Sequence, residues 1–279
     1  MDLQQIGLQH PRIKQLRHVL NNTSASLRRF FVAEGLWAHN VLLELGTPIE
    51  MFLWCPEAAY AQEAHTRSEQ FAAQAEHAYR ISPKVLERIA ERDRPDGLVS
   101  LVGMPRWDPA TVSLGRSSLV LVADGIEIPG NLGTLLRTLD ACGGDCLILT
   151  NRRTRLSHPK VFRGSRGMVL RVPVLDLGEP ADAAQWLRDR GYNVYLATPG
   201  SDAVVYHDAE FGARTAIVVG NERYGISAPW FDHGFARVAV PMFGAADSLN
   251  VSVCASILLY AARTRIWSWN VRDPPPGTG

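Results

Sequence analysis

The sequence of 279 residues is poor in cysteine and lysine and contains no long apolar run. Among its four cysteines only Cys142 and Cys146 are close, and a C-x3-C pair without a second Cys or His cluster is a poor zinc signature. No apolar run approaches the ~20 residues that cross a bilayer, and the N-terminus lacks the apolar core of a secretory signal. We therefore expect buried free thiols, no metal site and a cytoplasmic location.

The overall charge does not identify a partner. The formal net charge is +1, and the hydrophobic and charged fractions, 46% and 20%, are ordinary for a globular protein. Lysine occurs only at positions 14, 84 and 160, so that nearly every cation is an arginine. The planar guanidinium suits phosphate and base edges, but a GC-rich genome would produce the same composition. Local clustering of charge must therefore decide whether nucleic acid is bound.

Residues 1–103 are predicted to form a small, helix-rich α/β module. Apolar residues recur at helical spacing in "IKQLRHVL" and "AEGLWAHNVLLELG", where Gly46 is a typical helix stop. Two strand candidates, "IEMFLWC" and "GLVSLVG", are separated by a predicted helix around "SPKVLERIAE". The stretch 104–116 is rich in Pro, Gly and polar residues and is the predicted linker.

Residues 117–270 alternate between apolar strands and helical segments. The strand candidates are "SLVLVAD", "DCLILT", "NVYLATP", "TAIVVGNE" and "ARVAVPM". This alternation predicts a mostly parallel sheet with helices on both faces, and such sheets bind ligands at the carboxyl ends of their strands. The tail, 271–279, is expected to be disordered.

The glycine-rich stretch "DGIEIPGNLGTLLR", residues 124–137, follows the first of these strands. Its spacing is G-x4-G-x2-G, which is neither a dinucleotide fingerprint nor a P-loop. A nicotinamide-dependent enzyme is therefore disfavoured. We interpret the glycines and Pro129 as shaping a turn that presents Asn131 and Arg137.

Three segments together resemble one family, the SpoU/TrmH-type RNA 2'-O-ribose methyltransferases of the SPOUT superfamily. They are "NLGTLLR" (131–137), "GNE" (220–222) and "PMFGAADSLNVS" (241–252), in the order and with the separation typical of the family. The segment "HPKVFRGSRGMVLRVPV" is similar to the family's sequence between its first two motifs. The segment "SLRRFFVAEGLWAHNVLLELG" resembles the ribosomal-protein-like substrate domain of many members that act on rRNA.

The resemblance implies that S-adenosylmethionine binds in a deep trefoil knot formed by the C-terminal loops. Small residues would allow the backbone to approach the cofactor, and apolar side chains would supply walls. The cofactor-binding residues so implied are Thr198, Pro199, Gly200, Gly220, Asn221, Val240, Met242, Ser248 and Leu249.

The resemblance also implies the residues that act on the substrate. Arg137 matches the family's catalytic arginine; because a guanidinium is very hard to deprotonate, we expect it to position the 2'-hydroxyl and stabilise charge. Asn131 would anchor the substrate side, and Glu222 would orient Arg137 or Asn250. The implied catalytic set is Arg137, Asn131, Glu222, Ser248 and Asn250.

RNA binding is expected to rely on a basic run between the first two motifs, "NRRTRLSHPKVFRGSR". The candidate RNA-binding residues are Arg28, Arg29, Arg152, Arg153, Arg155, Lys160, Arg163, Ser165 and Arg166. Members of the family are homodimers, and the apolar segment 251–260 is a candidate for the interface, with burial in the core of one chain as the alternative.

The sequence departs from the family at one place. Most members have Asp-Pro before the asparagine of the first motif, whereas this chain has Ile128-Pro129-Gly130. The same change occurs in the avilamycin- and thiostrepton-resistance rRNA methyltransferases of producing actinomycetes, so a resistance enzyme is one reading. The N-terminal module favours 23S rRNA as substrate; tRNA, or non-catalytic RNA binding on the same fold, remain the alternatives.

Overall fold

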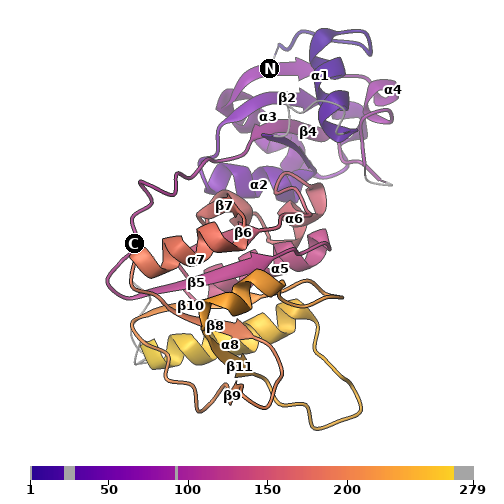
Figure 1. Ribbon diagram of the computed structural model, residues 1–279. Helices are drawn as coiled ribbons and strands as arrows, with labels where there is room; N and C mark the ends of the chain where they lie inside the picture. Colours follow the sequence, from indigo (N-terminus) through magenta and orange to yellow (C-terminus); the bar gives the residue numbers. More distant parts are fainter. Residues whose placement is uncertain (1, 22–28, 92–93, 267–279) are drawn as a thin grey trace. The chain divides into compact units, whose positions relative to one another are not determined.

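The computed structural model describes residues 2–21, 29–91 and 94–266. The chain divides into two compact units (Figure 1). One comprises Met1–Pro105 with Leu156–Pro159, and the other comprises Arg106–Arg155 with Lys160–Gly279. Each unit has its own sheet. The tail 271–279, expected to be disordered, lies outside the described residues. Within the described ranges, no helix is long and apolar enough to cross a membrane.

The first unit contains a four-stranded mixed sheet with the strand order β1-β4-β2-β3. Strand β4 is antiparallel to β1 and β2, whereas β2 and β3 are parallel. The strands are β1 (Phe30–Glu34), β2 (Ile49–Trp54), β3 (Ala75–Arg80) and β4 (Leu98–Gly103). The helices are α1 (Pro11–Leu20), α2 (Leu36–Glu44), the 3-10 helix η2 (Pro56–Ala58), α3 (Gln62–Gln74) and α4 (Pro83–Leu86).

Strands β1 and β3 were not predicted from the sequence. The helical spacing read over residues 33–46 is interrupted at Gly35, whose φ of 92° ends β1 and allows α2 to begin one residue later. Strand β3 lies at an edge of the sheet and is only partly buried, so its apolar pattern is weak. Gly46, with φ 60°, follows the end of α2, as expected of a helix stop.

The second unit contains a seven-stranded sheet with the order β7-β6-β5-β10-β8-β11-β9, and every pairing in it is parallel. Its strands are β5 (Ser118–Asp124), β6 (Cys146–Thr150), β7 (Val174–Gly178), β8 (Asn193–Ala197), β9 (Val204–Val205), β10 (Arg214–Val219) and β11 (Ala236–Ala239). The central strands β5, β6 and β10 are buried almost throughout. The mostly parallel α/β sheet predicted from the alternating pattern is thus confirmed, with β7 and β9 as additions.

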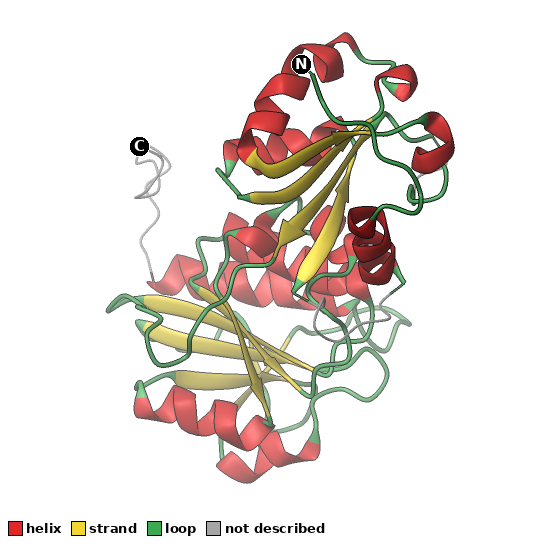
Figure 2. Ribbon diagram, turned by 90° about the horizontal axis from the view of Figure 1, so that it is seen from above, coloured by secondary structure: helices red, strands yellow, loops and turns green. Residues whose placement is uncertain are grey.

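Helices lie on both sides of this sheet (Figure 2). Helix α7 and η4 cover one face, where Trp186 and Trp230 pack among strand side chains such as Val122 and Val218. Helices α5 and α8 pack against each other and α8 lies against β10 and β5. The helical segments are α5 (Pro129–Ala141), α6 (Pro159–Gly164), η3 (Met168–Leu170), α7 (Pro180–Asp189), η4 (Ala228–His233) and α8 (Val251–Ile266).

The glycine-rich stretch 124–137 is helical from Pro129 onward, which corrects the interpretation of Gly130 and Gly133 as turn residues. Gly125, with a φ of 66°, does lie in the turn that leads from β5 to α5. Helix α5 already begins at Pro129, a residue that suits the first helical position. A Cβ on Gly133 would lie 2.8 Å from the carbonyl oxygen of Val161 and 2.9 Å from the Cα of Gly164. Gly133 is therefore required for the close approach of α5 to α6.

The segment between β4 and β5, which contains the predicted linker, has no regular helix or strand. Its middle is nevertheless attached to the second unit. The backbone oxygen of Pro109 accepts hydrogen bonds from Trp186 Nε1 and from Arg190, both at 3.1 Å. Val112 and Leu114 pack against the core of that unit. The segment is thus fixed at its centre.

Candidate active site

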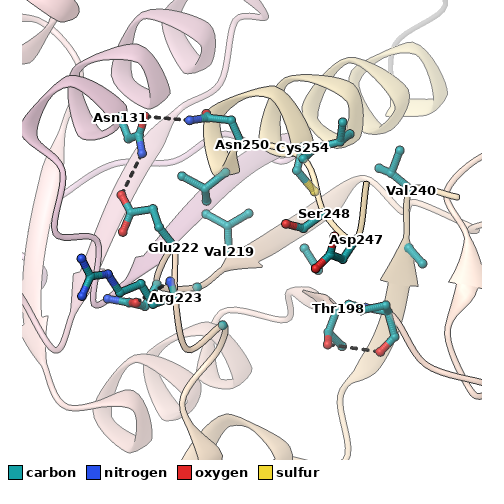
Figure 3. Close-up of a pocket in the computed structure, with 18 of the residues that line it drawn as sticks. Asn131, Thr198, Val219, Glu222, Arg223, Val240, Asp247, Ser248, Asn250 and Cys254 are labelled. Atoms are coloured by element: carbon teal, nitrogen blue, oxygen red, sulfur yellow. Dashed lines mark hydrogen bonds between the residues drawn. The ribbon is translucent and has the colours of Figure 1, made fainter. Parts of the chain in front are cut away.

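A pocket of about 470 Å³ opens at the carboxyl ends of β8, β10 and β11. The start of α8 and the loop before it complete its wall (Figure 3). This is the edge at which parallel sheets bind ligands. The lining residues are Ile128, Asn131, Ala197, Thr198, Pro199, Val219, Gly220, Asn221, Glu222, Arg223, Gly225, Val238, Ala239, Val240, Met242, Asp247, Ser248, Leu249, Asn250, Val251 and Cys254.

The three sequence motifs meet in this pocket through a group that we term the amide–carboxylate cluster, Asn131, Glu222 and Asn250. Asn131 Nδ2 donates to Glu222 Oε1 at 2.8 Å, and Asn250 Nδ2 donates to Asn131 Oδ1 at 3.1 Å. Figure 3 shows Asn131 between the two partners. Ser252 Oγ donates to the backbone oxygen of Asn131 at 3.2 Å. The cluster therefore fixes the orientation of the Asn131 amide.

Glu222 is held in its ionised form by its hydrogen bonds. Burial alone would raise the pKa of this carboxyl, but hydrogen bonds from Asn131 and from the backbone N–H groups of Glu127 and Ile128 outweigh burial and lower the pKa below its ordinary value. Glu222 thereby joins the start of α5 to the segment after β10. Glu222 was predicted to orient Arg137 or Asn250. Among the described residues Glu222 makes no hydrogen bond or ion pair with Arg137, and it is linked to Asn250 through Asn131.

The segment Asn221–Gly225, which we term the rim turn, is a tight turn at the edge of the pocket. Asn221 and Gly225 exchange backbone hydrogen bonds at 2.8 and 2.9 Å. Asn221 Oδ1 accepts from the N–H groups of Arg223 and Tyr224, and its Nδ2 donates to Gly125 O. A Cβ on Gly220 would overlap the backbone of Gly225 and Ile226. The glycine and the asparagine of the second motif therefore build this turn.

The segment just after the turn is tied to the sheet by Asp124, a buried carboxylate at the end of β5. Its Oδ1 accepts from Thr150 Oγ1 and Asn151 Nδ2, both at 2.8 Å. Its Oδ2 accepts from the backbone N–H of Ser227 at 2.8 Å. Asp124 did not appear among the predicted site residues, although it is a polar residue at the carboxyl end of a buried strand. It supports the site and does not line it.

The residues Pro241–Leu249, which we term the motif loop, are more exposed than the rim turn at Phe243 and lack its backbone hydrogen bonds among the described residues. Phe243 is 95% exposed and Met242 is 38% exposed. None of the backbone N–H groups between Met242 and Leu249 donates a hydrogen bond within the described part of the chain. Met242, Asp247, Ser248 and Leu249 line the pocket. The loop therefore offers backbone donors to a bound molecule.

Most of the predicted catalytic and cofactor-binding residues line the pocket, and Arg137 and Gly200 do not. Arg137 lies six residues after Asn131 on α5, and six residues turn a helix by about 240°. Its side chain is exposed and makes no hydrogen bond or ion pair within the described ranges. Reasoning from motifs missed Arg223, Asp247 and Cys254, although each is next to, or a few residues from, a motif position.

The predicted RNA-binding residues differ in how exposed their side chains are. Arg29, Arg153, Lys160, Arg163 and Arg166 are exposed, and Arg155 is partly buried. Arg152 is also exposed, and its Nε lies 2.9 Å from Asp176 Oδ2. Arg28 lies outside the described residues.

The prediction that Ser165 contacts RNA does not agree with the structure. Its side chain is fully buried, donates to Phe162 O at 3.1 Å and accepts from the N–H of Val169 at 3.3 Å. A hydroxyl whose hydrogen bonds are made inside the fold stabilises the turn after α6 and does not face a ligand.

Comparison with known proteins matches both parts of the chain. Residues 118–260 match the SpoU rRNA Methylase family, and residues 10–100 match the MRM3-like substrate binding domain. The 23S rRNA (guanosine(2553)-2'-O)-methyltransferase RlmP of Bacillus subtilis is 31% identical over 185 residues, which cover 66% of this chain and 72% of the relative.

Solved structures agree over nearly the whole chain. A structure described as an RNA 2'-O ribose methyltransferase is 32% identical, with a TM-score of 0.76, and the alignment covers 94% of this chain and 98% of the other. The AdoMet-bound rRNA methyltransferase from Sinorhizobium meliloti is 26% identical, with a TM-score of 0.82 and coverage of 95% and 98%.

Proposed function

The chain belongs to the SpoU rRNA methylase family, and from that premise we propose that it transfers a methyl group from S-adenosylmethionine to a ribose 2'-hydroxyl of ribosomal RNA. The observation that carries the proposal is the amide–carboxylate cluster, in which one residue from each motif meets at one pocket. The names of the similar proteins support 23S rRNA as the substrate, and so does the match to a substrate-binding domain.

The pocket fits S-adenosylmethionine in size, polarity and charge. Its volume lies within the roughly 300–1,000 Å³ typical of small-molecule sites. Val219, Val240 and Leu249 supply apolar surface, and the motif loop supplies backbone N–H donors. Two lining carboxylates, Glu222 and Asp247, with Arg223 complement a molecule that carries a sulfonium, an ammonium and a carboxylate. When bound, the cofactor supplies an electrophilic methyl group.

The chain's own residues would orient the acceptor. The Asn131 amide is fixed between Glu222 and Asn250, so it can present a hydrogen-bonding group to a ribose without reorganising. The role of Arg137 would be to bind an RNA phosphate near the reacting ribose, which its planar guanidinium suits. The proton acceptor for the 2'-hydroxyl is left unassigned.

We further propose that two copies of the chain associate through α8. Val253 and Tyr260 on this helix are each 48% exposed, which leaves an apolar strip uncovered. Other residues of the helix, such as Leu258 and Leu259, are fully buried within the chain. The loops around the pocket would form the trefoil knot expected of the family. Light scattering of the purified protein tests the dimer.

RNA binding would draw on the exposed cations of the segment 152–166. Arg153, Arg163 and Arg166 are exposed and do not line the pocket, so their contacts with phosphates would not compete with the cofactor. Because phosphate contacts release counterions, affinity should fall steeply as salt rises. Unchanged RNA affinity between low and high salt would contradict this part of the proposal.

The decisive experiment supplies tritiated S-adenosylmethionine with rRNA, tRNA or assembled ribosomal subunits as acceptor. Primer extension at low nucleotide concentration then maps the ribose that is methylated. Arg137→Ala should abolish transfer while cofactor affinity by calorimetry stays within about 2-fold, since Arg137 lies outside the pocket. Transfer to tRNA alone would support a tRNA enzyme, and cofactor binding without any transfer would support a non-catalytic RNA-binding protein.

The site of cofactor binding can be tested separately through Cys254. It lines the pocket and is the cysteine that keeps some exposure, whereas Cys55, Cys142 and Cys146 are buried. Burial raises the pKa of the Cys254 thiol, so labelling needs alkaline buffer. Protection of Cys254 from a maleimide by S-adenosylmethionine supports the assignment; equal labelling with saturating cofactor contradicts it.

A further inference from the structure

The tip of the rim turn carries a large aromatic side chain that the fold does not use. Tyr224 is 80% exposed. Within the described part of the chain, its ring contacts no other aromatic ring and its side chain makes no hydrogen bond. Its backbone N–H, in contrast, is bonded to Asn221 Oδ1 at 3.1 Å. The backbone of Tyr224 is therefore fixed while its ring is offered to solvent.

The turn around Tyr224 is held rigid by backbone and side-chain hydrogen bonds. Asn221 and Gly225 close it with two backbone hydrogen bonds, and the Asn221 side chain anchors it to Gly125. Gly225 has a φ of 71°, a conformation that glycine adopts without strain. A side chain on such a turn loses little conformational freedom when it binds.

Tyr224 also lies beside the reacting site. Its neighbours on both sides, Arg223 and Gly225, line the pocket, as does Glu222 of the amide–carboxylate cluster. Figure 3 shows Arg223 and Glu222 together at one side of the pocket. The turn thus combines a cation that suits a phosphate with an aromatic face at the mouth of the site.

We propose that Tyr224 stacks on an unpaired base of the RNA next to the target ribose, with Arg223 beside it for a phosphate. The inference rests on the proposed function and names the structural class of substrate, namely an unpaired or extruded nucleotide. Sequence-specific RNA recognition uses such stacking on aromatic side chains, because unpaired bases expose a π-face. A ribose inside a regular helix would not present that face.

Phe243 is more exposed than Tyr224, at 95%, but we do not assign it this role. It belongs to the motif loop, whose backbone N–H groups make no hydrogen bonds among the described residues. Ordering that loop around RNA would cost conformational entropy that the rim turn does not have to lose. A second copy of the chain is the other occupant that an exposed aromatic could meet, and the experiment must separate it from RNA.

The test compares Tyr224→Leu with Tyr224→Phe in the full-length protein with S-adenosylmethionine present. The probe is a fluorescein-labelled, mixed-sequence unpaired RNA, alone and annealed to its complement. Tyr224→Leu keeps apolar bulk but has no π-face, so it should weaken binding of the unpaired strand by about 10-fold. Tyr224→Phe should restore the affinity, and the KM for rRNA should follow while kcat changes less.

The matched control is Trp107→Leu, since Trp107 is 37% exposed, does not line the pocket and lies outside the matched substrate binding domain. Cofactor affinity by calorimetry should be the same in all variants. Unchanged RNA affinity in Tyr224→Leu, an equal loss in Trp107→Leu, or a loss that accompanies a change from dimer to monomer in light scattering would each overturn the inference. Wild-type protein that methylates no RNA would overturn the proposed function instead.

Discussion

Each unit of the chain contains a polar network, and the two networks have similar hydrogen-bond lengths but different surroundings. In the first unit, His39 Nδ1 donates to Gly35 O at 2.8 Å and its Nε2 accepts from Ser100 Oγ at 2.8 Å, and both side chains are fully buried. In the second unit, the amide–carboxylate cluster has hydrogen bonds of 2.8 and 3.1 Å and lines an open pocket.

The difference shows how a polar network can be assigned to structure or to function. Burial lowers the pKa of His39 to about 4, so the ring stays neutral and closes its hydrogen bonds inside the fold. Glu222 keeps its charge because amide and backbone donors surround it at the edge of a pocket. A satisfied network without access to solvent stabilises the chain; one that faces a pocket can also meet a ligand.

The largest effect is expected from the substitution Gly220→Ala, which disrupts the pocket of the second unit. The new Cβ would overlap the backbone of Gly225 and Ile226, which cannot move without opening the rim turn. We expect loss of cofactor binding and a destabilisation of about 3 kcal/mol, at the upper end for overpacking. Urea denaturation and calorimetry measure both.

The control for this change is Gly244→Ala in the motif loop. A Cβ there meets nothing within 4 Å, and the residue does not need a positive φ. Gly244→Ala should therefore leave the free energy of unfolding within about 0.5 kcal/mol of the wild type. Equal destabilisation by the two substitutions would contradict the distinction between the rigid turn and the loop.

Two substitutions, one in each network, should distinguish a loss of activity from a loss of stability. Asn131→Ala removes the central amide of the cluster, and we expect methyl transfer to fall by about 100-fold with about 1 kcal/mol lost in stability. His39→Ala should cost about 2–3 kcal/mol of stability through lost packing and unpaired partners, with cofactor affinity unchanged. If His39→Ala weakens cofactor binding while the fold is intact, the assignment of its network to structure alone is wrong.

The two networks should also respond to acid in different pH ranges. Because the pKa of His39 falls from 6.5 to about 4 on folding, the stability it contributes is complete above pH 6.5 and is lost as the pH falls towards 4. The lowered pKa of Glu222 contributes stability that is complete above about 4.5 and is lost below it.

Between pH 6.5 and 4.5 the first unit should therefore weaken before the second does. Hydrogen exchange read separately over strands β4 and β10 at pH 7 and pH 5.5, corrected for the intrinsic rate, would show this order. The variant His39→Gln should remove most of the pH dependence of β4. A parallel decline of both strands in wild type and variant would rule out His39 as its cause.

The smallest effect is expected in the amide exchange of the motif loop. It tests the difference between this loop and the rim turn. S-adenosylmethionine at about 100 times its Kd should slow amide exchange between Met242 and Leu249 by about 10-fold. These N–H groups donate no hydrogen bond to the described residues of the free protein, so any protection would come from the ligand. The rim turn should change little, because its hydrogen bonds already exist. Greater slowing in the rim turn than in the loop would reverse this picture.

The strands of the two sheets differ in how clearly their sequence predicts them. The strands β5, β6 and β10 are apolar runs buried on both faces, so their composition alone identified them. Edge strand β3 carries no such signal, because it is partly exposed and its apolar pattern is weak. Strand β9 is only Val204–Val205, which is too short to show a period. Strand β1 was not predicted, and its last two residues, Ala33 and Glu34, were included in a helical stretch, since the turn at Gly35 changes the period from strand to helix within one residue.

For the site, the motifs identified the residues and the family but not their arrangement. Asn131, Glu222 and Asn250 were selected by motif, and their mutual hydrogen bonds span about 90 to 120 positions of sequence. Ser165 was misread because a serine in a basic segment looks accessible until burial is known. Asp247 and Arg223 were missed because only the fold shows that they line the pocket.

By itself the sequence determined the parallel α/β class, the membership of an RNA methyltransferase family and the residues of its three motifs, since apolar periodicity and motif order are local properties of the chain. The tertiary structure alone decided that Glu222 meets Asn131, that Arg137 lies outside the pocket and that Tyr224 stands exposed at its rim. Those facts depend on which strand ends lie side by side and on how far a helix turns between two residues, and neither is encoded at any single position.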